Sequence, residues 1–522
     1  MTDGPADLIV AGGTIHSADD ACVAPEAFAV RGNRFVYVGS AAAAMALRGP
    51  STEVLNVRGK TVLPGLIDAH LHLTNLGFKL HRADVTGARS LDEVVARAAA
   101  FARSSRDTWI LGRGWDQTLW AGDAFPTHDM LSAAIPDRPV ALARIDGHAV
   151  LTNARAMAMA GVAASTADPA GGRVLRDASG RPSGVFVDAA QALIYDAVPP
   201  PTGERLVEAT RAAISECNRW GITAVAEPGC NDAVLAAHIT LIELGEYSIR
   251  NHAMLDDEPA LVEAHVRAGL LDAGHDGRLW VRSVKMYADG ALGSRGAALL
   301  EPYSDDPENR GLILTPGVRI AEFTERALRA GWQVCCHAIG DRANRMVLDA
   351  FEAALLRVPS DDPRLRVEHA QVIDPSDIPR FAALGIVASV QATHRVSDMA
   401  WARARLGPQR LRTAYAWRSL LDAGAQVANG TDAPVESPST PRTFHASITN
   451  AVQSMTRREA LASMTIWAAR ANFQDRAIGS IAPGKYADFA VIDRDWMTVA
   501  QEDIETTEIL GTYFGGRRVY PR

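Results

Sequence analysis

The chain has 522 residues, of which 48% are hydrophobic and 22% charged, and its formal net charge is −8. These values are those of a soluble globular protein with a large core, and they exclude a disordered, collagenous or coiled-coil chain. The acidic balance, without any run of Lys or Arg, disfavours a nucleic-acid or membrane-binding face. The sequence therefore predicts a small-molecule partner, no nucleic acid and no membrane, and leaves a homo-oligomer open.

The cysteine content and the N-terminus indicate the compartment. The chain has no Cys-x-x-Cys pair, and its five cysteines are too few and too scattered for a disulfide framework. The first residues, Met-Thr-Asp-Gly, lack the positive charge of a signal peptide, and no apolar stretch approaches the ~18 residues that span a bilayer. We therefore expect a cytoplasmic protein with reduced thiols.

The two ends of the chain have a similar pattern of short β-rich runs and turn residues. The first sixty residues alternate short β-rich runs with turn pairs, as in Asp7 to Ala11 followed by Gly12-Gly13. The same texture returns where Gly479 to Lys485 leads into the run Ala487 to Ile492. Neither end has enough apolar surface to fold comfortably alone. We therefore predict one discontinuous β-sandwich domain built from residues 1–62 and 478–522.

Between the two ends, short apolar strands alternate with helical stretches rich in Ala, Leu, Glu and Arg, the βα repeat of a parallel TIM barrel. We predict an α/β fold with a (β/α)₈ barrel over residues 63–477. The segment between the first and second predicted strands is too long for one crossover connection. We therefore expect residues 75–204 to form an inserted subdomain over the barrel mouth. The eight predicted strands are Leu63 to Asp68, Ile222 to Ala226, Ile249 to Met254, Leu279 to Met286, Trp332 to His337, Leu365 to His369, Ile386 to Gln391 and Gln426 to Gly430.

The first predicted strand runs into Ala69-His70-Leu71-His72. Side chains two residues apart on a strand share a face, so His70 and His72 would point together into the barrel. Two converging imidazoles suit a divalent metal. A His-x-His pair is common by chance, however, and alone does not establish a metal site.

Four further candidate ligands follow or end other predicted strands: Lys285, His337, His369 and Asp432. The active sites of barrel enzymes form at the C-terminal ends of the strands. A purely structural explanation would need each of these polar residues to lie at that rim without a purpose. The set therefore favours an active site.

The segments that carry these residues resemble a known family. They are the lysine segment from Val284 to Arg295, His337-Ala-Ile-Gly-Asp341, Val367-Glu-His-Ala370, Gly430-Thr-Asp-Ala-Pro434 and the terminal Pro-Gly-Lys-Tyr-Ala-Asp488. Together, and in this order, they are similar to the amidohydrolase superfamily, in particular to the amidohydrolase family 3 branch, which includes N-substituted formamide deformylases. The resemblance covers nearly the whole chain.

This resemblance implies a binuclear metal centre, usually zinc, although some members of the superfamily use one metal. His70, His72 and Asp432 would bind one ion, and His337 and His369 the other. Lys285, as its carbamate, would bridge the two. The reaction it implies uses a metal-activated hydroxide, with Asp432 as the proton shuttle.

Other residues are weaker candidates. Each of the predicted substrate contacts has an alternative interpretation as a surface or packing residue. Glu227, just after the second predicted strand, is either a carboxylate at the barrel rim or a helix cap, and the sequence leaves both open. The predicted substrate contacts are Trp115, Asp116, His148, Arg295, His394 and Trp401.

We therefore expect a metal-dependent hydrolase of a non-peptide C–N bond in an amide, formamide or N-acyl small molecule with an apolar or aromatic part. A lactone or ester hydrolase with the same metal centre is the alternative, because the nucleophile does not distinguish the leaving atom. A non-catalytic metal-binding regulator is a third hypothesis. It predicts a damaged ligand set, whereas every ligand that the resemblance implies is present.

Overall fold

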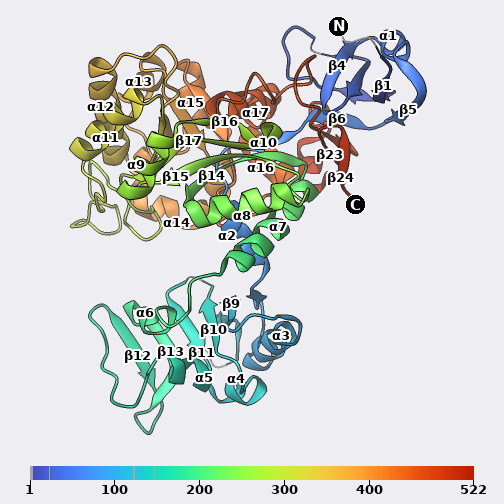
Figure 1. Cartoon of the computed structure of the whole chain (residues 1–522). Coiled ribbons are helices and arrows are strands. Elements are labelled where there is room, and N and C mark those ends of the chain that lie inside the picture. The colour runs from blue at the N-terminus through green and yellow to red at the C-terminus, as the bar shows by residue number, and fades with distance from the viewer. Residues whose placement is uncertain (1–3, 23, 122–123, 146, 522) are drawn as a thin grey trace. The chain divides into compact units, whose positions relative to one another are not determined.

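The computed structural model describes residues 4–22, 24–121, 124–145 and 147–521, and Figure 1 shows the course of the chain. The chain divides into two compact units. The barrel unit comprises Met1–Leu76 and Leu206–Arg522, and the inserted unit comprises Gly77–Arg205. None of the described helices is both long and apolar enough to cross a membrane.

Eight parallel strands of the barrel unit form one sheet, in the order β7, β14, β15, β17, β18, β19, β20, β21. The first and last of them meet where the backbone N–H of Ala69 donates to the carbonyl of Asn429 at 3.1 Å. The predicted (β/α)₈ barrel is thus confirmed. The strands are β7 (Leu66–Asp68), β14 (Ile222–Cys230), β15 (Arg250–Asp256), β17 (Leu279–Tyr287), β18 (Gln333–Ala338), β19 (Arg366–His369), β20 (Val387–Val390) and β21 (Gln426–Asn429), and the short β16 (Leu271–Ala273) pairs with β17.

Helices follow the barrel strands and lie outside them in Figure 1. Each buries one stripe of side chains, as α7 does with Leu206, Ala209, Ala213 and Cys217 at spacings of three and four residues. The helices are α2 (Leu73–Leu80), α7 (Gly203–Arg219), α8 (Asp232–Glu243), α9 (Pro259–Ala268), α10 (Gly274–Gly277), α11 (Gly317–Arg329), α12 (Asp341–Arg357), α13 (Ile378–Ala383), α14 (Ala392–Arg410), α15 (Trp417–Asp422), α16 (Thr440–Ile448), α17 (Arg457–Ser463) and α18 (Ile466–Ala471).

Two further sheets are built from the ends of the chain: one has only N-terminal strands, blue in Figure 1, and the other combines blue N-terminal with red C-terminal strands. Their shared core includes Val10, Phe28 and Phe35 from one end and Phe489 and Tyr513 from the other. One sheet has β4 (Arg34–Gly39), β3 (Ala27–Arg31), β1 (Ala6–Ala11) and β5 (Arg48–Asn56), with the short α1 (Ala41–Met45); the other has β2 (Thr14–Ile15), β6 (Thr61–Pro64), β22 (Phe489–Ile492), β23 (Ile509–Phe514) and β24 (Arg517–Tyr520).

The first predicted barrel strand is divided in the structure. Leu63 lies in β6 and pairs with Ala490 in the terminal sheet, whereas the barrel strand β7 begins only at Leu66. Gly65 joins the two, and a Cβ atom there would lie 2.1 Å from Thr223 Oγ1. The chain passes from one sheet to the other at a point where only glycine fits. The prediction of one strand over Leu63 to Asp68 was therefore wrong at its start.

The inserted unit has its own six-stranded sheet. Alternate residues of its strands enter two cores, one with Leu142 and Leu151 and the other with Ala141 and Val150, so the sheet is covered on both faces. That this unit covers the barrel mouth stays a prediction. Its strands are β12 (Gly172–Arg176), β13 (Pro182–Asp188), β11 (Ala149–Thr152), β10 (Val140–Arg144), β9 (Ile110–Trp115) and β8 (Ala83–Asp84), and its helices α3 (Leu91–Ser104), α4 (Asp129–Ala134), α5 (Ala154–Met159) and α6 (Ala192–Tyr195).

Candidate metal centre

Asp68, the last residue of β7, ties the first barrel strand to the last. Its carboxylate accepts hydrogen bonds from the backbone N–H groups of His70 (3.1 Å) and Thr431 (3.0 Å) and from Thr431 Oγ1 (2.6 Å). The backbone N–H of Asp432 in turn donates to the carbonyl of His70 at 2.7 Å. These contacts place His70, His72 and Asp432 together, although 360 residues separate His72 from Asp432 in the sequence.

The imidazoles of His70, His72 and His394 lie around the Asp432 carboxylate, at distances longer than those of ordinary hydrogen bonds. Asp432 Oδ1 lies 3.3 Å from His72 Nε2 and 3.7 Å from His70 Nε2, and Oδ2 lies 3.8 Å from His394 Nε2. Two ligand atoms that each lie ~2.1 Å from one tetrahedral ion are about 3.4 Å apart. The group His70, His72 and Asp432, and the group His369, His394 and Asp432, each have the composition and the spacing of a metal site.

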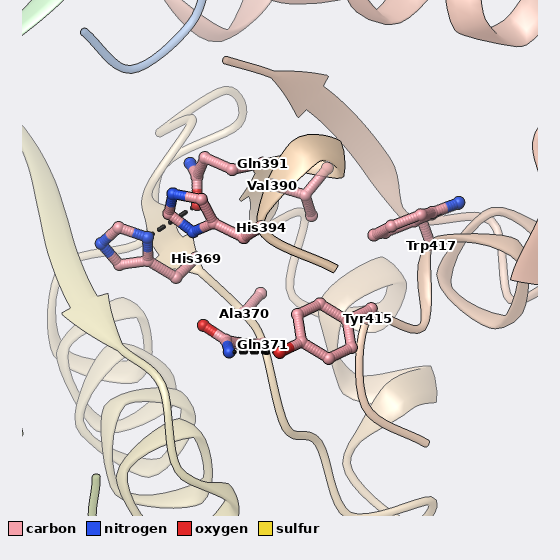
Figure 2. Close-up of a pocket in the computed structure, with 8 residues that line it drawn as sticks. All are labelled: His369, Ala370, Gln371, Val390, Gln391, His394, Tyr415 and Trp417. Atoms are coloured by element: carbon pink, nitrogen blue, oxygen red, sulfur yellow. Dashed lines mark hydrogen bonds between the residues drawn. The ribbon is translucent and has the colours of Figure 1, made fainter. Parts of the chain in front are cut away.

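His337 and His369 lie next to these groups. The ring of His369 is 4.6 Å from that of His337 and 5.1 Å from that of His70, measured between centroids, and it stacks on His394 at 6.1 Å. Figure 2 shows Gln391 hydrogen-bonded to His369, with Oε1 2.6 Å from Nδ1. Gln391 thereby fixes the ring and leaves Nε2 of His369 for another partner.

Lys285 reaches the same cluster from β17. Its side chain is 1% exposed, and its Nζ lies 3.4 Å from Nε2 of His70. Burial lowers the pKa of the Lys285 amine, although the carboxylates of Glu368 and Asp432 oppose the shift. The structure thus brings the predicted ligands His70, His72, Lys285, His337, His369 and Asp432 into one cluster, and their role as metal ligands stays a prediction.

Glu368, to which no sequence pattern assigned a role, contacts His70 directly. Its Oε2 lies 2.5 Å from His70 Nδ1, and Arg366 donates to both of its oxygens, at 2.7 and 3.0 Å. Burial alone would raise the pKa of Glu368, but Arg366 and His70 hold it well below its usual value. An ionised Glu368 that accepts the Nδ1 proton leaves the lone pair of His70 on Nε2, which faces the cluster.

The protonation of the cluster suits metal ligands. Burial lowers the pKa of His70 to about 4 and that of His337 to about 3, so both imidazoles are neutral near pH 7. Nε2 of His337, Nε2 of His394 and Oδ1 of Asp432 are buried and have no hydrogen-bond partner among the described residues, although Asp289 Oδ1 lies 3.5 Å from His337. Buried polar atoms normally have partners, so these residues fit a divalent cation.

The predicted substrate contacts of the barrel unit lie in different settings. His394, on the first turn of α14, belongs to the cluster described above rather than only to its surroundings. Arg295 forms an ion pair with Asp305 at 3.1 Å and is one third exposed. Trp401 packs partly buried against the barrel core beside Gly293. A substrate role for Arg295 and Trp401 stays a prediction.

The other three predicted contacts belong to the inserted unit. Trp115 is fully buried in its core and donates from Nε1 to the carbonyl of Leu142 at 2.6 Å. Asp116 accepts from Arg144 at 3.0 Å, and the largely exposed His148 is 2.8 Å from Asp188. Packing and local ion pairs account for these residues within their unit, and their substrate roles stay predictions.

A small cavity adjoins His369 and His394. Tyr415 and Trp417 line it, and Tyr415 belongs to a polar network that the sequence did not reveal. The Tyr415 hydroxyl donates to Asp398 at 2.7 Å and accepts from Gln371 Nε2 at 2.8 Å, the second bond being drawn in Figure 2. The cavity therefore has an aromatic wall on one side and metal-type ligands on the other.

A family model, proteins of other organisms and a solved structure each match most of this chain. A model of the amidohydrolase family matches residues 53–520. The protein LONG AFTER FAR-RED 3 of Arabidopsis thaliana is 34% identical over 99% of this chain and 92% of its own length. An N-substituted formamide deformylase of Arthrobacter pascens is 27% identical over 99% and 98% of the two chains. The crystal structure of an uncharacterized metal-dependent hydrolase from Pyrococcus horikoshii superposes with a TM-score of 0.80 at 26% identity, covering 95% of this chain and 99% of that one.

Proposed function

Because the chain belongs to the amidohydrolase family, we propose that it is a metal-dependent hydrolase that cleaves a C–N bond in a non-peptide amide, formamide or other N-acyl small molecule. The observation that carries this proposal is the cluster at the barrel rim. Side chains from separate barrel strands and their loops converge there with neutral imidazoles, and several of their buried polar atoms lack a hydrogen-bond partner among the described residues.

His70, His72 and Asp432 would hold one divalent ion, and His337 and His369 a second. The position of His394 beside Asp432 makes it a further candidate ligand on the side of His369. Imidazole and carboxylate together suit Zn²⁺ best. A bound divalent ion supplies Lewis acidity toward a substrate carbonyl and lowers the pKa of water.

Asp432 is the proton carrier of the proposed reaction. Its Oδ1 has no hydrogen-bond partner among the described residues, and the backbone bond from Asp432 to His70 fixes where the residue lies. A carboxylate in this position takes a proton from the attacking water and delivers it to the departing amine. Protonation of the nitrogen is what allows an amine to leave as a neutral molecule.

Lys285 acts as a carbamate. An ammonium group has no lone pair for a metal, whereas the neutral amine that burial favours can add to carbon dioxide. The addition forms one N–C bond and releases one proton, and it leaves an anionic carbamate with two oxygens. Those two oxygens can span ions roughly 3.5 to 4 Å apart, the separation common in two-metal hydrolases.

The substrate has an apolar or aromatic part. The similarity to an N-substituted formamide deformylase supports an amide whose nitrogen bears such a group. Dipeptide-like or phosphorylated compounds that turn over much faster than aryl or alkyl amides would contradict this substrate class.

Product analysis tests the proposal. The zinc-loaded protein is screened against N-formyl, N-acetyl, N-aryl and cyclic amides, with lactones as controls. Release of an amine supports the proposal, and release of an alcohol alone supports the alternative of a lactone or ester hydrolase. Bound metal without turnover of any member of the panel supports a metal-binding regulator.

A further inference from the structure

Glu227, which the sequence left open as a rim carboxylate or a helix cap, contacts the segment that carries His72. It lies near the end of β14 and is 3% exposed. Its Oε1 accepts the backbone N–H of Thr74 at 2.8 Å. Thr74 lies in the first turn of α2, two residues after His72.

This contact completes the start of α2. The carbonyl of His72 accepts the first helical hydrogen bond, from the backbone N–H of Leu76 at 2.8 Å, so His72 is the N-cap residue. The side chain of an N-cap residue commonly accepts from a backbone N–H of the first turn. The His72 imidazole instead faces Asp432, and Glu227 supplies the acceptor from the neighbouring strand. A carboxylate at this end of a helix is also favoured by the helix dipole.

Glu227 itself is held by two further side chains. Its Oε2 lies 2.9 Å from His238 Nε2 on α8 and 2.7 Å from Asn251 Nδ2 on β15. The other nitrogen of His238 is 3.3 Å from the hydroxyl of Tyr247. Glu227, His238 and Asn251 are all buried. The carboxylate is therefore fixed in position before it meets α2.

We propose that Glu227, held by His238 and Asn251, is a positioning residue that orients His72 by capping the helix directly after it. The inference rests on the proposed function, since it assigns His72 to a metal site. Glu227 touches neither substrate nor ion. It acts through the backbone of Thr74.

The same side chains do not form a second metal site. Glu227, Cys230 and His238 have suitable ligand atoms within 4.8 Å of one another. However, the contacts of Glu227 with His238 and Asn251 are hydrogen bonds of 2.9 and 2.7 Å, shorter than the ~3.4 Å between two ligands of one tetrahedral ion. The Cys230 thiol donates to the carbonyl of Glu227 at 3.5 Å, and burial raises its pKa, so it is not a thiolate.

The length of the side chain at position 227, more than its charge, should decide how firmly the metal is held. In Glu227→Gln the carbonyl oxygen still reaches Thr74. The new amide can donate to Asn251 when the Asn251 amide turns over, so that its Oδ1, which has no partner among the described residues, takes the place of Nδ2. In Glu227→Asp the charge remains, but the carboxylate withdraws from Thr74 by one methylene group. Glu227→Ala removes the cap altogether.

The experiment measures how fast the metal-loaded protein releases its metal to an excess of a chromogenic chelator. We expect Glu227→Asp and Glu227→Ala to release it about 10-fold faster than the wild type, at the lower end of the effects of residues that orient ligands. Glu227→Gln should release it at nearly the wild-type rate, and Cys230→Ser should keep the wild-type metal content. Arg250→Met is the control for a general loosening of the barrel. Arg250 lies on β15, next to β14, and its replacement breaks the buried ion pair with Asp488, whose atoms are 2.6 Å apart.

The outcomes separate this inference from the proposed function. If the wild type binds no divalent ion, the proposed function is wrong. If the wild type binds metal but the Asp and Ala variants release it no faster, only the positioning role is wrong.

The control variants also test the positioning role of Glu227. An equal acceleration of metal release in Arg250→Met, or a Gln variant that releases metal as fast as the Asp variant, would overturn that role. A loss of bound metal in Cys230→Ser would show that the cluster is itself a metal site. Should Glu227→Ala fail to fold, the comparison between the Gln and Asp variants decides.

Discussion

Lys285 has almost no contact with water, and its amine lies 3.4 Å from a histidine nitrogen. An ammonium group in this position would have few donors satisfied and would repel a nearby cation. The positive charge of the Lys285 ammonium group is unfavourable in the buried site. Conversion to a carbamate would make the side chain negative. Under the proposed function, formation of the carbamate would turn a side chain that repels a nearby cation into one that can bind it.

Replacing Lys285 with Ala should abolish activity and lower the number of bound ions, because the bridging oxygens are lost. Short-chain carboxylates such as acetate should restore part of the activity, since they supply two oxygens to the space left by the side chain. Metal analysis and turnover measure both effects. Lys485→Ala, at a partly buried lysine that donates to the carbonyl of Ile478, is the control. A Lys285→Ala variant with two tightly bound ions and near-normal turnover would contradict the bridging role.

The lowered pKa of Glu227 predicts how the stability of the fold changes in acid. Burial alone would raise the pKa of Glu227, but His238, Thr74 and Asn251 lower it from 4.5 to about 2. The group therefore stabilises the fold fully above pH about 4.5, and this contribution is lost as the pH falls toward 2. The Tm advantage of the wild type over Glu227→Gln should narrow as the pH falls from ~4.5 toward ~2. Thermal unfolding of both proteins across this range tests it, and a constant difference would speak against an ionised Glu227.

The side chains of the candidate metal cluster could be named from the sequence, whereas the residues that orient them could not. His70, His72 and Lys285 follow from strand alternation and from the rule that barrel sites form where strands end. Glu368 binds His70 from 298 residues away, and no local pattern indicates which ring a buried glutamate will meet. His394 lies near Asp432 only because the start of α14 points toward the end of β21.

The elements of the barrel are specified by local patterns, except where two sheets meet. The barrel strands are almost continuously buried, as in β14, where only Gly229 is not, and such apolar runs are visible in the sequence. The division between β6 and β7 is not visible, because the residues on both sides of Gly65 are apolar. The two segments differ in their pairing partners, since β6 pairs with β2 and β22 whereas β7 pairs with β14. Both β22 and β14 lie more than 150 residues away.

Gly65→Ala tests this junction. The added Cβ would meet Thr223 and Asp488 within 3 Å, so one of the two sheets must shift, at a cost of roughly 1 to 3 kcal/mol. We expect a clear fall in Tm. Gly203→Ala is the matched control, because nothing lies within 4 Å of its added Cβ and alanine favours the helix that Gly203 begins. Equal Tm values for the two variants would mean that the junction tolerates a side chain.

At the scale of the barrel unit, the C-terminal end of the chain is connected to the barrel by buried polar contacts. Arg250 of β15 makes two hydrogen bonds to Asp488, at 2.6 and 3.0 Å, and Asp488 also accepts from the backbone of Gly515 at 2.8 Å. The candidate metal cluster joins His70 and His72, which follow the first barrel strand, to Asp432, which follows the last. An ion bound there would hold the two strands together.

Removal of metal should lower the Tm of the whole protein. An ion that binds only the folded state stabilises it by about 4 kcal/mol at a thousand-fold excess over Kd, and its loss leaves buried ligand atoms without partners. The chelated protein should unfold at a temperature lower by a few degrees, and added Zn²⁺ should restore it. Calorimetry of the chelated and reloaded protein measures the change. An unchanged Tm would indicate that the cluster holds no ion.

The most direct test of the whole account is the release of amine from non-peptide amides by the metal-loaded protein. We predict that aryl or alkyl N-formyl and N-acyl compounds yield an amine, that chelation abolishes the release, and that Zn²⁺ restores it. A fully loaded protein that releases no amine from any of these compounds, or that yields only an alcohol from lactones, would contradict the assignment of a C–N hydrolase.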